Sequence, residues 1–489
     1  MDAQALVRQL GVWSKGRGSL HQKLALALTN AIRHGFLMPG LRLPSERALA
    51  NALSVSRTTV VTVYDELRER RWLDSRPGSG TWVSERSAVV MAARTTAHAT
   101  ALAASPLLGL LISHDDADVI DFALGTPTPL DGLPPELFTL PPDEHAALLR
   151  DRLYYPLGLP ALRRAIASAY SNEGLDTHVE QVLVTNGAQQ AIALSAALCL
   201  QHGDTVLVED PSYFGALDVC RTIGARLATV PVGVDGVSPS AIRERIAATG
   251  ARLIYLTPTF QNPTGSVMPA WARKEIAQIS SAAGVPLIDD RTTADLLLDG
   301  SPPAGPIARY SPSAPIFTVG SLSKLVWPGL RVGWVRAPEP LIQRLARVKT
   351  AMDLGSPLLT QAIGARVVGA IPEARRLRQR ELKPRRDLLK ALLRDQLPEW
   401  RFRVPSGGLF LWVQLAHADA REYAQVAFRH GIVTLPGPNM SAAEDHASFL
   451  RVPFFGEPDT LRSAADRLSA AWYEYRHSTR QRRQPIALV

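Results

Sequence analysis

Apolar residues near the start of this chain recur with the spacing of helices. The pattern is clearest over 20–33, and it predicts one helix there and a longer one over 56–71. A short helix is expected from Ser45, which can cap its first turn. A Gly-rich turn at 76–80 then separates two short β-prone pieces. Residues 1–83 are therefore predicted to form a small helical unit that ends in a β wing.

From about residue 119 the pattern changes to short apolar runs, each followed by a loop and a helical segment. The runs lie at 181–184, 205–208, 253–256, 285–288 and 316–319. Apolar strands that alternate with helices predict a mostly parallel sheet buried on both faces, which is an α/β fold. Ligands of such sheets bind at the carboxyl ends of the strands, so we expect the chemistry directly after each run. The Ala/Ser/Thr-rich segment 84–118 is predicted to be a linker.

Composition excludes several classes of protein. The chain has 489 residues, of which 46% are hydrophobic and 20% charged, so it can bury large cores and is not disordered by composition. Two cysteines, Cys199 and Cys220, provide neither a disulfide framework nor a metal cluster. The sequence contains no long uncharged apolar stretch and no secretion signal at its start. We therefore expect a cytoplasmic protein without a membrane partner.

The net charge of +9 is distributed unevenly. Residues 1–86 contain thirteen Lys and Arg against seven Asp and Glu, and the tail 476–489 adds four Arg. The remaining residues carry a net charge of −1. A basic head on a nearly neutral body indicates a polyanionic partner. The basic tail is predicted to be a solvated end beyond the last helical pattern.

The head contains residues suited to reading DNA. Because Ser56 is a natural N-cap, Arg57, Thr58 and Thr59 fall in the first turn of the predicted 56–71 helix, where they can reach bases and phosphates. The same spacing also suits a three-helix module that binds another protein. Residues 20–83 resemble the winged helix-turn-helix of the GntR family of bacterial regulators, through Leu43-Pro-Ser-Glu-Arg, Val55-Ser-Arg-Thr-Thr-Val and the Gly-Ser-Gly wing. The resemblance implies that double-stranded DNA is contacted by Arg42, Arg47, Ser56, Arg57, Thr58, Thr59 and Gly78.

In the body, the most informative run is Gly320-Ser-Leu-Ser-Lys-Leu-Val-Trp-Pro-Gly-Leu-Arg. Its lysine, Lys324, lies between hydroxyls and an arginine, directly after a buried strand, and a lysine amine can condense with an aldehyde. A single lysine is otherwise most often a solvated surface charge.

Four further loops add complementary groups, each with a purely structural alternative. Thr185-Asn-Gly enters a helix and can bind a phosphate, or it is a plain glycine cap. Tyr213 can stack on a planar ring, or it belongs to the core. Asn262 can donate to a phenolate oxygen, or it lies in a turn. A carboxylate in Asp289-Asp290 can hold a pyridine nitrogen protonated, or it caps the next helix.

The order of these motifs resembles the fold-type I aminotransferases, which use pyridoxal 5'-phosphate, over roughly 119–475. The resemblance implies a small α+β C-terminal subdomain at about 345–475. It implies Lys324 as the Schiff-base lysine, Asp289 as the partner of the pyridine nitrogen and Arg451 as the ligand of a substrate α-carboxylate. The other cofactor-binding residues that it implies are Gly187, Ala188, Gln189, Tyr213, Asn262, Arg291, Ser321, Ser323 and Arg331.

One position departs from the pattern. Many relatives have a Tyr two or three residues after the aspartate, whereas this chain has Arg291 and Thr292. Efficient transamination is therefore in doubt, and Asn262 alone or with Arg291 would hold the ring oxygen.

A GntR-type head joined to an aminotransferase-like body resembles the MocR subfamily of regulators. The resemblance implies a PLP-dependent DNA-binding regulator, whose body senses an amino acid, an amine or the cofactor itself through Lys324. It also implies a head-to-tail homodimer, which would suit paired DNA half-sites. A working aminotransferase with an attached DNA-binding head is the alternative, and a body that serves only for dimerisation is a third.

Overall fold

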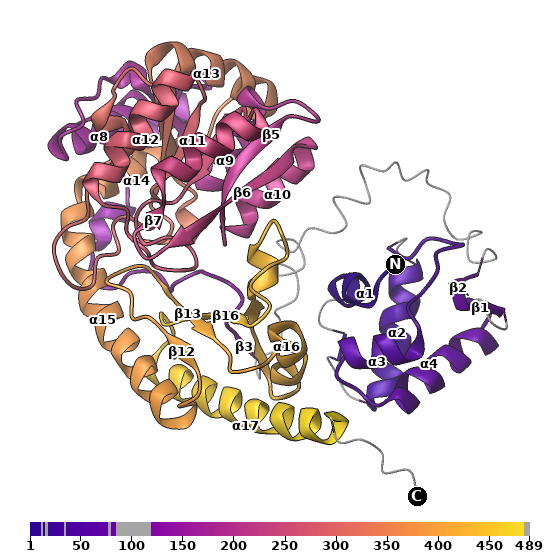
Figure 1. The fold of residues 1–489 in the computed structure, drawn as a ribbon. Coiled ribbons are helices and arrows are strands. Elements are labelled where there is room, and N and C mark those ends of the chain that lie inside the picture. The colour runs from indigo at the N-terminus through magenta and orange to yellow at the C-terminus, as the bar shows by residue number, and fades with distance from the viewer. Residues whose placement is uncertain (11–12, 15–17, 34–35, 77–79, 85–118, 484–489) are drawn as a thin grey trace, which may run out of the picture.

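The structure is a computed structural model, and it describes residues 1–489 except 11–12, 15–17, 34–35, 77–79, 85–118 and 484–489 (Figure 1). The predicted linker at 84–118 therefore lies almost entirely outside the described residues.

The head is a group of helices followed by a two-stranded hairpin. Its elements are α1 (Ala3–Leu10), α2 (Leu20–Arg33), α3 (Glu46–Ala52), α4 (Arg57–Glu69), β1 (Leu73–Arg76) and β2 (Gly80–Val83). The side chains of Leu24, Leu49 and Val60 are fully buried in one core. Helix α1, which the hydrophobic pattern did not predict, adds Leu6 to this core.

Serine caps start the two helices of the helix-turn-helix. Ser45 accepts a hydrogen bond from the Ala48 amide at the start of α3, and Ser56 accepts one from the Thr59 amide at the start of α4. The buried Tyr64 of α4 donates its hydroxyl to the Pro44 carbonyl over 3.0 Å. These bonds set the turn between the two helices.

The body is built on an eight-stranded sheet in the order β4-β11-β10-β9-β8-β5-β6-β7. Its strands are β4 (Val182–Thr185), β5 (Thr205–Asp210), β6 (Arg226–Gly233), β7 (Gly236–Val237), β8 (Leu253–Leu256), β9 (Leu287–Asp290), β10 (Ile316–Ser321) and β11 (Gly333–Arg336). The neighbouring pairs from β10 through β9, β8 and β5 to β6 are parallel, whereas β11 and β7 are antiparallel to their neighbours. This mixed, mostly parallel sheet confirms the predicted α/β fold.

Helices cover both faces of the sheet (Figure 1). One face packs on α9 (Ala188–Cys199), α10 (Phe214–Ile223) and α13 (Glu339–Asp353). The opposite face packs on α8 (Pro160–Asn172), α11 (Pro239–Thr249), α12 (Ala270–Ala283) and α14 (Leu358–Gly369). Because side chains alternate along a strand, Ile288 of β9 belongs to the first face and Leu287 to the second.

A second sheet, in the order β12-β13-β16-β15, forms the later part of the body. It comprises β12 (Arg401–Phe402), β13 (Phe410–Gln414), β15 (Leu435–Pro436) and β16 (Phe449–Pro453). The helices of this part are α15 (Ile371–Gln396), α16 (Ala420–Arg429) and α17 (Pro458–Arg483). A two-stranded parallel pair joins β3 (Ile120–Asp121) to β14 (Ile432–Val433).

The remaining elements are short. Helix α7 (Pro142–Arg150) precedes α8, and single 3-10 turns occur at Pro135–Phe138, Val179–Gln181, Ile307–Tyr310, Pro328–Leu330 and Gly437–Met440. One expectation about the end of the chain is wrong: residues 476–483 continue helix α17 instead of following it. Among the described residues, no helix is both long and apolar enough to cross a membrane.

Candidate functional site

Of the residues predicted to contact DNA, Ser56, Arg57, Thr58 and Thr59 lie at the start of α4, Arg47 lies on α3, and Arg42 lies beside the hairpin. Arg42, Arg47, Ser56, Arg57 and Thr58 are exposed, and Thr59 is half-buried. The Arg57 side chain is 69% exposed and forms a 3.4 Å ion pair with Glu46, so its guanidinium is available to another partner. Gly78 lies outside the described residues.

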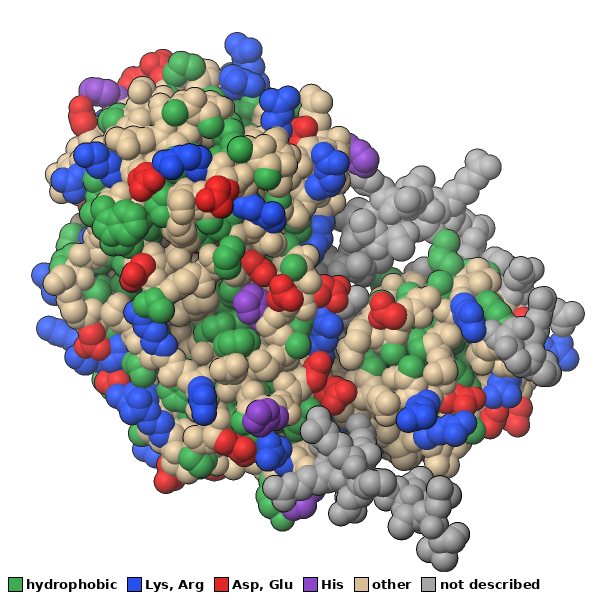
Figure 2. Space-filling model, in the orientation of Figure 1, with side chains coloured by type: hydrophobic (Ala, Val, Ile, Leu, Met, Phe, Trp, Pro, Cys, Tyr) green, Lys and Arg blue, Asp and Glu red, His purple; other side chains and the backbone are tan. Residues whose placement is uncertain are grey.

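Two of these residues also support the head itself. The Ser56 hydroxyl lies 2.8 Å from that of Thr59 and caps α4, so both side chains have a structural task. Arg42 lies beside the hairpin, with its guanidinium 5.9 Å from the Trp82 ring centre. On the face of the body seen in Figure 2, Lys and Arg side chains are interspersed with Asp and Glu.

Most of the predicted residues of the body line a cavity of about 370 Å³ at the carboxyl ends of the strands. Of these residues, its wall includes Ala188, Gln189, Tyr213, Asn262, Ser321, Ser323, Lys324, Arg331 and Arg451. They come from segments up to 263 residues apart, between Ala188 and Arg451, and the sheet brings them to one edge.

Lys324 projects into this cavity just after β10, and its ammonium group donates to the Gly125 carbonyl. Burial and the nearby Arg451 and Arg331 lower the pKa of Lys324 from 10.5 to about 8, while Asp290 acts in the opposite direction. A lysine with this pKa is partly neutral near pH 8, and the neutral amine is the nucleophile.

An anion cradle lies beside the lysine at the start of α9. Gly187 has φ +81°, and a Cβ there would come within 2.8 Å of the Arg331 guanidinium, so only glycine fits. Arg331 donates to the Asn186 carbonyl over 2.6 Å and is otherwise exposed. Ser321 and Ser323 lie 3.0 Å apart by their hydroxyl oxygens on the same side. Helix N-terminal amides, two hydroxyls and a guanidinium are groups that bind phosphate.

The carboxylate of the cavity is Asp290, not Asp289 as the sequence interpretation assigned. The predicted run 285–288 placed both aspartates after the strand, whereas β9 spans Leu287–Asp290 and contains both. Alternation along the strand then sends the two carboxylates to opposite faces of the sheet. Asp290 lines the cavity, and Asp289 accepts from the Ile307 amide on the other face.

Asp290 is held by three hydrogen bonds. Tyr255 donates its hydroxyl to Oδ2 over 2.7 Å, and the amide and hydroxyl of Thr292 donate to Oδ1 over 3.0 and 2.8 Å. Burial raises the pKa of Asp290, while these bonds and the charge of Lys324 lower it. Thr292 and Thr293, two and three residues after Asp290, also line the cavity.

Arg291 is a second correction. It was predicted to bind the cofactor, but its side chain points to the Asp289 face and forms an ion pair with Glu173 over 3.4 Å. It does not line the cavity of Lys324.

Arg451 occupies the opposite wall, on β16, and its side chain is almost fully buried. It donates to the Ala123 carbonyl and, over 3.3 Å, to Oδ1 of Asn262, which leaves the Asn262 amide nitrogen free to donate into the cavity. Its guanidinium stacks over Phe410 at 4.1 Å, and its Nε is buried without a hydrogen-bond partner. Tyr213 donates to Gln189 over 3.1 Å, which holds its ring at the cavity wall.

Sequence reasoning missed several residues that hold this site together. Tyr255 and Thr257 lie at or just after β8 in an apolar run, with no motif to distinguish them from core residues. Asp353 accepts from the side chains of Asn186 and Gln190 over 3.2 and 2.7 Å and so fixes the cradle loop from a distant helix. No sequence signal linked these positions.

The comparisons with known proteins agree with this arrangement. Residues 117–468 match the family Aminotransferase class I and II, and residues 20–83 match Bacterial regulatory proteins, gntR family. The chain belongs to the aminotransferase class I and II family, in the group of regulators that carry a GntR-type DNA-binding head.

Individual relatives define the group to which the chain belongs more closely. The chain is 31% identical to the uncharacterized HTH-type transcriptional regulator YisV of Bacillus subtilis (strain 168), over 83% of this chain and 86% of that protein. It is 30% identical to the probable rhizopine catabolism regulatory protein MocR of Rhizobium meliloti, over 78% of each. These relatives confirm the MocR-type architecture of a DNA-binding head fused to an aminotransferase-like body.

A solved structure resembles the body alone. It is LysN, the alpha-aminoadipate aminotransferase of Thermus thermophilus, complexed with N-(5'-phosphopyridoxyl)-L-leucine. The TM-score is 0.66 and the identity 29%, with 76% of this chain and 95% of the other covered.

Proposed function

We propose that this protein is a cytoplasmic transcription regulator whose body binds pyridoxal 5'-phosphate and senses an amine, an amino acid or the cofactor itself through Lys324. The observation that carries the proposal is one cavity in which Lys324, Asp290 and the Arg331 cradle converge, in a chain whose head exposes residues predicted to contact DNA.

The residues of the cavity fit this cofactor group by group. Ala188, Ser321, Ser323 and Arg331 would hold the phosphate, and the buried carboxylate of Asp290, which Tyr255 and Thr292 hold in place, would face the pyridine nitrogen. Tyr213 would pack on the ring and Asn262 would donate to the ring oxygen. When bound, the cofactor supplies an aldehyde that condenses with amines and a ring that accepts electrons.

Lys324 has the properties that this role needs. Its lowered pKa, about 8, makes its amine available near neutral pH. An effector with an α-carboxylate would meet Arg451, whose buried Nε lacks a partner. The two groups together favour an amino acid or a similar amine as effector.

A second copy of the chain is expected to cover part of the body. Leu153, Tyr154, Met352 and Leu354 are large apolar side chains that are 62%, 69%, 58% and 49% exposed. Gly355 packs directly against the Tyr154 carbonyl, so the two segments lie side by side. An exposed apolar cluster of this kind favours a homodimer, and a two-fold dimer suits paired DNA half-sites.

The proposal is tested by visible absorption spectroscopy of the purified protein titrated with pyridoxal phosphate. Wild type should acquire a saturable band above 400 nm, roughly as protonated imines of this cofactor absorb, and borohydride should fix the cofactor to Lys324. Lys324→Ala should acquire neither. The same spectrum in both proteins would refute the cofactor role of Lys324.

A working aminotransferase with a DNA-binding head is the second candidate, because the cavity keeps both Asp290 and Arg451. The residues two and three positions after Asp290 are Thr292 and Thr293, and the absence of a Tyr at both positions weakens the candidate. Sustained formation of alanine from pyruvate and an amino-acid donor, at more than about one turnover per second, would favour it.

A further inference from the structure

A second cavity lies on the other face of the sheet, and the proposed function does not use it. It has a volume of about 350 Å³ and is lined by α8, the end of α14, the start of α15, the strands β10 and β11 and the loop after β9. Of the residues that line it, only Ser321 also lines the Lys324 cavity. The volume is within the range of sites that hold small organic ligands.

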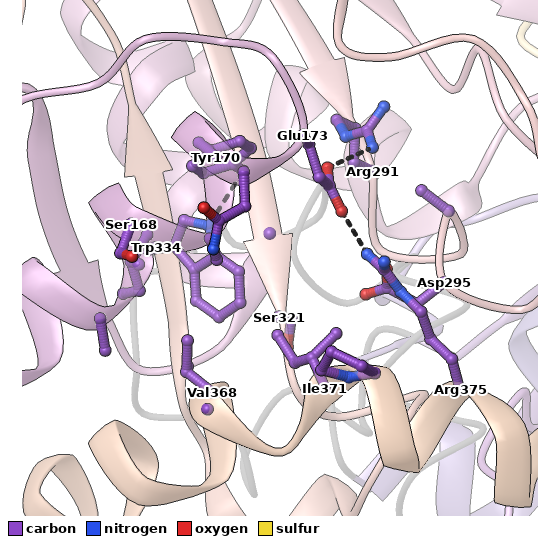
Figure 3. A pocket seen from close by; sticks show the side chains of 18 residues that line it. Ser168, Tyr170, Glu173, Arg291, Asp295, Ser321, Trp334, Val368, Ile371 and Arg375 are labelled. Atoms are coloured by element: carbon purple, nitrogen blue, oxygen red, sulfur yellow. Dashed lines mark hydrogen bonds and ion pairs between the residues drawn. The ribbon is translucent and has the colours of Figure 1, made fainter.

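Most of the wall is apolar and contains one indole ring. Trp334 of β11 lies over Gly320, where a Cβ would come within 2.3 Å of the indole. The indole nitrogen donates to the Tyr170 hydroxyl over 3.0 Å, which fixes the ring in place. Val368 and Ile371 face it from the helices (Figure 3).

The opposite side of the cavity is polar. The Glu173 carboxylate lies between the guanidiniums of Arg291 and Arg375, and Asp295 also accepts from Arg375 (Figure 3). The Arg291 side chain is only 10% exposed, and its Nη1 is buried without a hydrogen-bond partner. Arg375 uses Nε and Nη2 for its two carboxylates, and its side chain is 40% exposed.

The unpartnered Nη1 of Arg291 and the partly exposed Arg375 guanidinium thus border a mostly apolar cavity that has one aromatic wall. Glu173 has both oxygens engaged, one with each arginine, and Asp295 accepts from Arg375, so the four side chains are charge-balanced and only the remaining guanidinium N–H donors are left for a ligand. A buried guanidinium N–H without a partner costs free energy that a bound carboxylate would recover.

We propose that this cavity is a binding site for a small aryl-alkyl carboxylate, whose ring packs on Trp334 and whose carboxylate binds Arg375 and Arg291. The site is separate from the Lys324 cavity but adjoins it, because Arg291 directly follows Asp290 and Ser321 lies on both walls.

Calorimetric titration of the full-length holo-protein with 3-phenylpropionate tests the proposal. Binding should saturate at one molecule per chain, and the uncharged 3-phenylpropanamide should bind at least tenfold more weakly. Ala169→Phe, which fills the cavity from α8, and Arg375→Met should each weaken binding of the acid at least tenfold. Circular dichroism and the melting temperature verify that the variants are folded.

Matched control variants distinguish this site from binding elsewhere on the chain. Arg376→Met alters the next residue on α15, which pairs with Glu373 on the surface, and it should leave the affinity within twofold of wild type. Arg451→Met should also leave it within twofold, because Arg451 belongs to the other cavity. Lys324→Ala should bind the acid equally well, so failure of the proposed function would not affect this result. The proposal is overturned if no saturable binding occurs, or if Arg451→Met abolishes binding while Ala169→Phe retains it.

Discussion

At the scale of single residues, the chemistry of the body depends on the direction in which each side chain of β9 points. Asp289 and Asp290 are chemically identical neighbours. Asp290 lines the cavity of Lys324, whereas Asp289 accepts a hydrogen bond from the Ile307 amide. The pleat of β9 makes this distinction.

The two aspartates provide a matched pair of variants. Asp290→Asn should weaken binding of pyridoxal phosphate at least tenfold, because the amide cannot hold the pyridine nitrogen protonated. Asp289→Asn keeps the acceptor for the Ile307 amide and should change the affinity less than threefold. Spectroscopic titration of both variants measures this, and equal losses would disprove the assignment of Asp290.

The pH dependence of cofactor capture reports the state of Lys324. The amine must lose its proton before it attacks an aldehyde, so the rate should rise with pH through a midpoint near 8, not near 10.5. Arg451→Gln removes a nearby positive charge that lowers the pKa of Lys324, so the midpoint should move to higher pH. Stopped-flow mixing with pyridoxal phosphate across roughly pH 6.5–10 measures both, and a downward shift would contradict the electrostatic account.

Most single-residue predictions came from motifs in which several groups lie close together in the sequence. Lys324, its serines and Arg331 could be found in this way, because one short run carries them all. The sequence could not show which of Asp289 and Asp290 faces the cavity, because the strand β9 ends two residues later than the apolar run 285–288 that predicted it. Tyr255 and Asp353 act through contacts that join distant segments, and these contacts exist only in the folded chain.

At the scale of elements, the sequence was sufficient to predict a helix or a strand wherever a capping residue or a buried apolar run marked the end of that element. The head helices begin at Ser45 and Ser56 as predicted, and the five apolar runs all form strands. Helix α1 and the extension of α17 to Arg483 lacked such signals. The antiparallel strand β11 depends on pairing with both β10 and β4, which no local pattern encodes.

The cap of α4 should be measurable on its own. Ser56→Ala removes the acceptor of the Thr59 amide and should destabilise the first turn by about 1 kcal/mol. Amide hydrogen exchange at Thr59 should then accelerate roughly fivefold. Thr62→Ala serves as the control, since that hydroxyl donates only to the Thr58 carbonyl inside the helix. Unchanged exchange in Ser56→Ala would show that the cap contributes nothing.

The first turn of α4 should also determine affinity for DNA. Arg57→Ala should weaken binding to DNA selected from a random-sequence pool by about 1–3 kcal/mol, since an exposed guanidinium there can contact a base or phosphate. Arg68→Ala, in the last turn of the same helix and paired with Asp65, should have little effect. Fluorescence anisotropy measures both, and equal effects would place the DNA contact elsewhere.

At the scale of the whole molecule, the chain joins a basic head to a nearly neutral body in which a lysine and several arginines line the proposed ligand sites. Lys324, Arg331 and Arg451 surround one cavity, and Arg291 and Arg375 lie at the second. If the body regulates the head, ligand binding in one must change the free energy of binding in the other, and this coupling is reciprocal.

The most direct test of the regulator is the DNA affinity of the full-length protein with and without its ligands. The dissociation constant for the selected DNA should differ at least threefold between wild type with and without pyridoxal phosphate. In Lys324→Ala the cofactor should leave it unchanged. Identical dissociation constants in wild type with and without the cofactor, and also after addition of a mixture of amino acids, would contradict a sensor that acts through Lys324.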